Sequence, residues 1–354
     1  MSPFTDRTKE IHVDTKRLRI ALIIVLAVAG SSIGDAQKVT KVGTTAAKFL
    51  SIPVGARALG MGGAFVAVAN DASALYWNAA GITSITQNEA LFTHAEWLAD
   101  ISFNFGAVVL PMGELGTAGV SFTSMTMGEM ERTTEDHPEG TGTFFTAGSF
   151  AVGVSYAKAL TEWFSIGGTA KYVNEHIWNS SATSIAVDVG TMFRTPFSGL
   201  QFGVAVTNFG QKMRIEGDDL LVQNDISANN GNNANVPGRL STDAFDLPLN
   251  LRIGFAFQPI ADDDKALTLV VDATHPNDNS ESISVGGEFA ALQKIVAVRA
   301  GYKALGEKDS EEQFTLGGGL RYDVGSGLIV KFDYAFEKFG RLENVHKFSI
   351  GVLF

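Results

Sequence analysis

From residue 88 to the C-terminus, apolar residues alternate with polar residues or glycine, and this pattern limits the possible folds more than any other feature. In the segment 328–337, one face carries Leu328, Val330, Phe332, Tyr334 and Phe336, and the other carries Ile329, Lys331, Asp333, Ala335 and Glu337. A period of two sustained over about ten residues indicates a β-strand whose faces meet different surroundings. Similar runs predict strands near residues 88–97, 100–110, 115–127, 144–157, 162–177, 182–194, 199–214, 247–257, 266–275, 280–290, 294–303, 313–323, 327–337 and 344–354.

Fourteen strands is an even number, within the range of about 8 to 26 found in bacterial outer-membrane barrels. The connectors after even-numbered strands are short, whereas the two long connectors, 128–143 and 216–246, follow odd-numbered strands. Barrels of this class have short periplasmic turns and longer outer loops. We therefore predict an all-β fold, a 14-stranded antiparallel transmembrane β-barrel over residues 88–354. The alternative is a soluble sandwich or propeller, but the sequence shows no blade-length repeat.

The N-terminus has the organisation of a secretory signal peptide. Basic residues up to Arg19 precede the apolar run 20–30, which is too short for a membrane-spanning helix. Small residues at Gly34 and Ala36 suit a signal-peptidase site. We expect residues 1–36 to be removed near Ala36, although an N-terminal anchor or a buried helix is the alternative. A cleaved signal peptide together with a barrel predicts an integral protein of the bacterial outer membrane.

Residues 37–87 lack the period of two and are rich in alanine and glycine. This segment is unsuited to facing lipid as a strand and too apolar for a free tail. We predict a hatch, a plug inside the barrel or across its periplasmic mouth, with small residues packed against glycines of the wall. A short helix is expected over 71–77, with Asp71 as its N-cap. Mixed charge on the inward strand faces, such as Arg252, Glu288 and Arg299, predicts hydrogen bonds between wall and hatch.

The hatch segment resembles the N-terminal signature of the PorV/PorQ-type family, whose fold is similar to that of FadL-type barrels. The resemblance covers about thirty residues in motif and is carried by Gly55, Arg57, Gly60, Gly62, Gly63, Asn70, Asp71, Trp77, Asn78 and Gly81. The family usually has Asn-Pro-Ala-Gly at the end of the motif, where this chain has Ala79 in place of proline. The resemblance implies a fourteen-stranded outer-membrane barrel with an N-terminal hatch.

The sequence offers little for catalysis or cofactors. The absence of cysteine excludes disulfides, zinc–thiolate sites, iron–sulfur clusters and cysteine nucleophiles. The net charge of −11 argues against nucleic acid as a partner. The histidines form no HxH or HxxxH pair, and only His137 beside Asp136 and His275 near Asp272 offer a conceivable rim site. We expect no catalytic residue, no metal site, no cofactor and no enzymatic activity.

The two long connectors are acidic and are candidates for docking a protein partner. The residues singled out are Glu131, Asp136, Asp218, Asp219, Asp225 and Asn230. The 31-residue connector 216–246 shows no clear structure in its sequence, which is typical of functional or disordered loops. The other interpretation is a hydrated surface facing divalent cations and lipopolysaccharide. The chain ends on Phe354, which resembles the assembly signal of outer-membrane barrels.

The resemblance implies a role in protein export by type IX secretion. The barrel would receive C-terminal signal domains of secreted cargo and carry them from the translocon to the attachment machinery, with secretion-system proteins as partners. The alternative is a FadL-like channel for long-chain fatty acids or other hydrophobic molecules. Such a channel needs an apolar pocket and a gap in the wall, which the pairs Gly167-Gly168 and Gly286-Gly287 could favour. A purely structural barrel is the third hypothesis.

Overall fold

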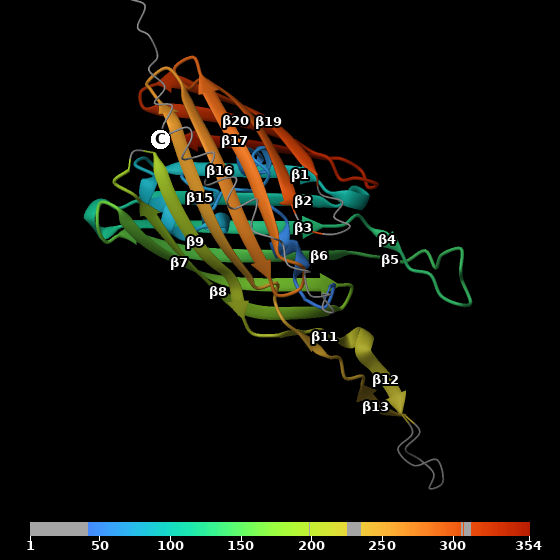
Figure 1. Cartoon of the computed structure of the whole chain (residues 1–354). Coiled ribbons are helices and arrows are strands. Elements are labelled where there is room, and N and C mark those ends of the chain that lie inside the picture. Colours follow the sequence, from blue (N-terminus) through green and yellow to red (C-terminus); the bar gives the residue numbers. More distant parts are fainter. Residues whose placement is uncertain (1–41, 198, 225–234, 306, 308–312) are drawn as a thin grey trace, which may run out of the picture. The chain divides into compact units, whose positions relative to one another are not determined.

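The computed structural model describes residues 42–197, 199–224, 235–305, 307 and 313–354. Fourteen strands in this part of the chain form one antiparallel sheet that closes on itself (Figure 1). Closure comes from two pairings, β1 with β21 and β8 with β9. The strands are β1 (Glu89–Glu96), β2 (Ser102–Pro111), β3 (Thr117–Thr126), β6 (Ala147–Ala159), β7 (Phe164–Ile177), β8 (Ser180–Arg194), β9 (Leu200–Gly210), β15 (Asn250–Ala261), β16 (Ala266–Pro276), β17 (Ser282–Ala291), β18 (Val296–Leu305), β19 (Phe314–Gly325), β20 (Leu328–Glu337) and β21 (Val345–Leu353). The predicted barrel is confirmed, and most predicted strand ends lie within a few residues of the observed ones.

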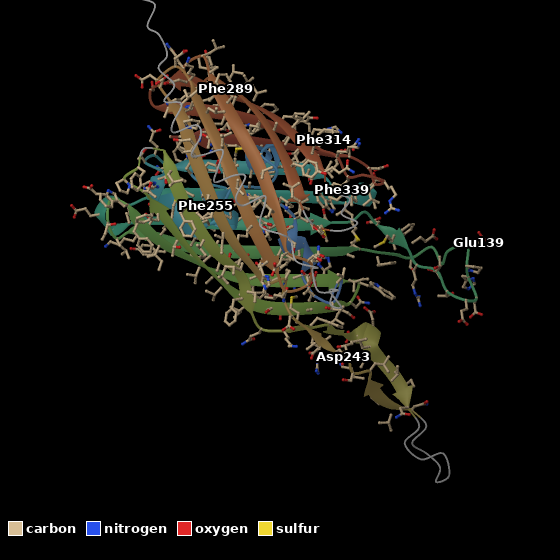
Figure 2. The ribbon with its side chains drawn as sticks, viewed as in Figure 1. Glu139, Asp243, Phe255, Phe289, Phe314 and Phe339 are labelled. Atoms are coloured by element: carbon tan, nitrogen blue, oxygen red, sulfur yellow. The ribbon has the colours of Figure 1, made fainter. Side chains whose placement is uncertain are left out.

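The two faces of the wall differ as the alternation predicted. Phe332 on β20 is 42% exposed, whereas its neighbour Asp333 points inward and is 9% exposed. Phe255 and Phe289 likewise lie on the outside of their strands (Figure 2). An apolar outer face and a polar inner face suit a barrel that has lipid around it.

The connectors divide the barrel into a short-turn end and a long-loop end. At the long-loop end, β4 (Met130–Glu131) and β5 (Phe144–Phe145) form one hairpin, and β12 (Leu221–Asn224) and β13 (Val236–Arg239) form another; both extend past the strand ends in Figure 1. The connector 216–246 is therefore not structureless, because it contains this hairpin, β11 (Glu216–Gly217), the helical turn η5 (Asp218–Leu220) and β14 (Ala244–Phe245). Just before it, β10 (Met213–Arg214) pairs with β14. The remaining connectors include the turns η3 (Leu98–Asp100) and η4 (Gly113–Leu115).

The N-terminal segment lies inside the barrel and runs along it. Its elements are η1 (Lys48–Ser51), α2 (Ala56–Gly60), α3 (Ala74–Trp77) and η2 (Ala79–Ser84). It starts at the long-loop end, where the Ala46 amide bonds to the Asp246 carbonyl, and finishes at the short-turn end, where Ser84 accepts a hydrogen bond from Arg194. None of the helices in the described residues is long and apolar enough to cross a membrane. The expected signal peptide, residues 1–36, lies outside the described residues.

Glycines allow the hatch and the wall to approach closely. Gly62 has φ +70°, and a Cβ there would lie 2.7 Å from the Val285 carbonyl oxygen on β17. On the wall, a Cβ at Gly286 would lie 2.1 Å from the Met61 carbonyl oxygen. Gly167 meets the Ala79 backbone in the same way. The predicted packing of small hatch residues on wall glycines is confirmed. One glycine of each pair, Gly167 and Gly286, thus makes room for the hatch, and the β6–β7 register continues unbroken past Gly167.

Candidate functional site

Arg57 connects the hatch to the wall through charged groups. Its guanidinium donates two hydrogen bonds of 2.9 Å to the Glu288 carboxylate on β17 and forms a 3.1 Å ion pair with Asp71. Asn70 accepts a further hydrogen bond at 2.6 Å. Glu288 also receives Arg299 at 2.6 Å, and Arg299 in turn bonds to Asp333 at 2.7 Å. Residues of the hatch motif and three wall strands therefore form one continuous charge network.

Burial would by itself raise the pKa of Asp71, because a carboxylate is poorly solvated inside the barrel. The charges of Arg57 and Lys331, with hydrogen bonds from Ser73 and Arg57, outweigh burial and hold that pKa below its usual 3.8. Burial by itself would lower the pKa of Arg57, but the negative charges of Glu288 and Asp71 outweigh burial and raise that pKa above its usual value. Both groups are therefore charged at neutral pH.

Other motif residues hold the internal shape of the hatch. The Trp77 indole donates to the Val54 carbonyl at 2.9 Å, and the Asn78 amide donates at 3.0 Å to the carbonyls of Val66 and Thr191, the latter on β8. Asn78 also caps η2 by accepting the Ala80 amide, so the turn forms with Ala79 in place of the family's proline. The glycines of the motif, Gly55, Gly60, Gly62, Gly63 and Gly81, lie within the hatch, and all but Gly60 and Gly81 have positive φ.

The expected N-cap role of Asp71 is wrong. Helix α3 begins at Ala74 with Ser73 as its N-cap residue, three positions beyond the start predicted from the sequence. The Asp71 carboxylate instead accepts the Ser73 amide and hydroxyl and pairs with Arg57. The Asp71 carboxylate therefore pairs with Arg57, fourteen residues earlier in the chain, and does not cap helix α3.

No histidine-based reaction centre is formed in the described residues. His275 pairs with Glu281 at 2.7 Å on the exposed rim, whereas Asp272 points inward and accepts the amides of Phe65 and Val66. Within these same parts of the chain, no three His, Asp or Glu side chains gather in a way that could hold a metal ion. Glu288 and Asp272 on the inner wall bond to the hatch, whereas pairs such as Lys171–Asp188 join wall strands to each other.

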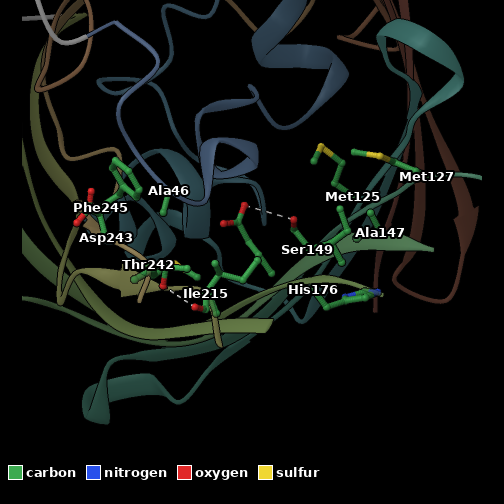
Figure 3. Close-up of a pocket in the computed structure, with 15 residues that line it drawn as sticks. Ala46, Met125, Met127, Ala147, Ser149, His176, Ile215, Thr242, Asp243 and Phe245 are labelled. Carbon is green, nitrogen blue, oxygen red and sulfur yellow. Dashed lines mark hydrogen bonds between the residues drawn. The ribbon is translucent and has the colours of Figure 1, made fainter. Parts of the chain in front are cut away.

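A cavity of about 590 Å³, here called the methionine cavity, lies at the long-loop end (Figure 3). Its lining is mostly apolar and comes from segments far apart in sequence. The apolar residues are Ala46, Met125, Met127, Ala147, Ile177, Ala182, Met213, Ile215 and Phe245. The lining also contains two carboxylates, Asp243 and Glu175, and one oxygen of Glu175 accepts the Ala47 amide at 3.0 Å. Methionine side chains are flexible and adapt to apolar ligands of varied shape.

A second cavity of about 620 Å³, here called the arginine cavity, lies at the same end. Its floor is the hatch, including Pro53, Gly63 and Trp77, and its wall includes Arg252, Ser284 and Lys303. Aromatic rings of Phe49, Trp97 and Phe339 also line it. The two cavities share Met125.

The candidate docking residues lie on the two hairpin arms. Glu131 accepts the Gly142 amide at the base of the β4–β5 hairpin. Asp136 is exposed in the segment that joins β4 to β5, and Figure 2 labels Glu139 of the same segment. Asp218 and Asp219 lie in η5, where Asp219 bonds to Asn179 and Ser180 and so fastens the second arm to the barrel. Asp225 and Asn230 lie outside the described residues. Phe354 follows β21 and its amide bonds to the Asn88 carbonyl.

A family model described as "Uncharacterised protein family (UPF0164)" matches residues 22–354. The chain belongs to this family. A comparison with curated proteins finds no match. The family relationship thus covers the whole barrel and the hatch.

Several solved barrels share this fold at low sequence identity. A Pseudomonas aeruginosa FadL homologue has a TM-score of 0.50 and 13% identity, covering 84% of this chain and 97% of that one. The Pseudomonas putida toluene transporter TodX has a TM-score of 0.53 and 12% identity, covering 84% of this chain and 96% of that one. The monoaromatic hydrocarbon channel CymD has a TM-score of 0.53 and 14% identity, covering 85% of this chain and 96% of that one. The chain therefore shares the barrel fold of these proteins.

Sequence reasoning found the hatch motif but missed both cavities. The lining of the methionine cavity combines Ala46, Met125, Ala147 and Met213 from four separate segments. The one signal available was Met125 and Met127 at the end of a predicted strand, on the side of the long connectors.

Proposed function

We propose that this protein is a non-enzymatic outer-membrane barrel that binds small hydrophobic molecules in the methionine cavity, as a step in their uptake. In this proposal residues 1–36 are a cleaved signal peptide, residues 37–87 are the hatch, and residues 88–354 are the barrel with its long-loop end outward. The observation that supports this proposal most directly is the apolar, methionine-lined cavity of about 590 Å³ at that end. A cavity of this size suits a small organic ligand. The fold shared with FadL and TodX barrels supports this assignment over protein export.

The test is binding of 4-bromotoluene to the purified barrel, measured by calorimetry, with the bromine located by anomalous diffraction from soaked crystals. Ala147 is 9% exposed and lines the cavity, so Ala147→Phe should fill part of it and weaken binding at least about tenfold. The matched control is Ala118→Phe on β3, whose neighbours Thr117 and Gly119 face inward, so its new ring projects toward lipid. Equal binding by both variants, or bromine density elsewhere, would contradict the proposal.

A second candidate is the export role implied by the hatch motif, and the two acidic hairpin arms favour it. Deleting 222–238 removes most of the β12–β13 hairpin but keeps Asp219 and its bonds to Asn179 and Ser180. Surface connectors tolerate such shortening, so the barrel should still assemble. Under the export hypothesis, pull-down of secretion partners falls while heat-modifiability stays normal. Unchanged pull-down would remove this arm as a docking surface.

A further inference from the structure

Arg252 is a buried cation that forms no ion pair among the described residues. It lies on β15 with 8% of its surface exposed and lines the arginine cavity. Among the described residues, no carboxylate forms an ion pair with it, and its one hydrogen bond is a 3.5 Å contact to the Tyr76 hydroxyl. A guanidinium carries five N–H donors in a planar fork. Burying such a charge is costly unless an acceptor meets it.

The hatch orients this guanidinium through ring contacts. Its central carbon lies 5.3 Å from the Tyr76 ring and 5.0 Å from the Trp77 ring. These ring contacts use no N–H donor, and with one N–H directed at the Tyr76 hydroxyl the remaining donors are available to another ligand. The nearby Asp272 carboxylate attracts Arg252 electrostatically without forming an ion pair, because one of its oxygens accepts the amides of Phe65 and Val66 at 2.7 and 2.9 Å.

The charge balance of the cavity limits the ligand to a single negative charge. The other two cations in the lining are already matched, Lys48 with Asp278 at 2.6 Å and Lys303 with Glu337 at 2.5 Å. Among the described lining residues, Arg252 is the cation without an ion pair, and the Glu307 carboxylate in the same lining opposes a second negative charge on the ligand. A planar guanidinium fork binds a carboxylate through two parallel hydrogen bonds. A dianion such as a phosphate monoester would need a second cation.

The rest of the lining suits a ring-bearing body. Trp77, Trp97 and Phe339 line the cavity together with the small polar side chains of Thr274, Ser282 and Ser284. Aromatic walls favour flat apolar groups through stacking and edge contacts. We propose that the arginine cavity is a binding site for an aromatic monocarboxylate, with the carboxylate on Arg252 and the ring against the aromatic residues. This site adjoins the methionine cavity, with which it shares Met125, and its ligand class differs from that of the proposed function.

The test compares 2-naphthoate with its neutral isostere 2-naphthamide, by calorimetry on the detergent-purified full chain at neutral pH. The wild type should bind naphthoate at least about tenfold more tightly than naphthamide, since a hydrogen bond between charged groups is worth one to two decades in affinity. Arg252→Gln should remove this preference. The matched control, Arg321→Gln, changes an exposed arginine at the short-turn end of β19 and should leave it intact.

Loss of Arg252 could disturb the hatch and so weaken binding indirectly. A second variant therefore blocks the cavity and keeps Arg252. Ser284→Phe adds a ring to the cavity and retains Arg252, so it should abolish naphthoate binding while the barrel remains heat-modifiable. Equal binding of naphthoate and naphthamide by the wild type, a preference for naphthoate retained in Arg252→Gln, or naphthoate binding retained in Ser284→Phe would each overturn the proposal. Binding of 4-bromotoluene in the methionine cavity is measured in a separate experiment. Either proposal can therefore be contradicted without affecting the other.

Discussion

Replacing Arg57 by methionine should release the hatch from the wall. The substitution keeps an unbranched apolar stem but removes four hydrogen bonds, two to Glu288 and one each to Asn70 and Asp71. Removing one partner of a buried ion pair costs about 3–5 kcal/mol, because the other charge is left unpaired. Glu288 keeps Arg299 at 2.6 Å, so Asp71 is the main stranded charge. Because only Asp71 loses its main partner, we expect Arg57→Met to destabilise hatch docking by about 3 kcal/mol, the low end of this range.

The assay is hydrogen exchange, followed by mass spectrometry of peptides covering residues 56–81. A cost of about 3 kcal/mol corresponds to exchange faster by about a hundredfold in these peptides, while amides in the barrel strands change little. The matched control is Lys212→Met, which breaks a 3.2 Å pair with Asp246 in which both side chains are more than half exposed. Exposed pairs contribute less than about 1 kcal/mol. Hatch exchange no faster in Arg57→Met than in Lys212→Met would refute the reasoning.

The same pair predicts the pH dependence of hatch docking. The folded-state pKa of Asp71 lies below 3.8, so its ionised form stabilises the hatch at pH values above 3.8. This contribution is lost as the pH falls through the folded-state value. The difference in hatch exchange between wild type and Arg57→Met should therefore be constant near neutrality and shrink in strong acid. A difference that grows on acidification would mean that Asp71 is not the stranded charge.

Further predictions concern the wall, the hatch and the N-terminus. Phe332→Arg, at mid-strand on the lipid face, should lower the free energy of unfolding in lipid by about 2–4 kcal/mol, whereas Tyr322→Arg near the short-turn end should cost about 0–1 kcal/mol; urea titration measures both. Gly62→Ala should destabilise the hatch more than Gly63→Ala, by about 1–3 kcal/mol in hydrogen exchange, because both have φ +70° but only Gly62 abuts backbone, at 2.7 Å. N-terminal sequencing of the membrane-purified protein should begin at Gln37; a start at Met1 would contradict a cleaved signal peptide.

The alternation of side chains along the sequence was enough to determine the barrel. A strand places successive residues on opposite faces, so Phe332 and Asp333 could be assigned to lipid and lumen from their order alone. Connector lengths placed both long loops at one end for the same reason, since antiparallel strands reverse direction at each turn. The density of small residues in the hatch likewise predicted close packing on wall glycines, as Gly62 and Gly286 show.

The partners of those residues were decided only by the tertiary structure. Arg57 and Glu288 are 231 positions apart, and no local pattern specifies which of several inward charges will meet. Asp71 shows the same limit, because local propensity favoured a helix cap and a charge from α2 prevailed. Arg252 was correctly placed on the inner face, but its lack of an ion pair among the described residues depends on the hatch, whose amides occupy one oxygen of the nearby Asp272. Both cavities exist because curvature brings distant strand ends and hatch segments together, and sequence periodicity contains no information about that spacing.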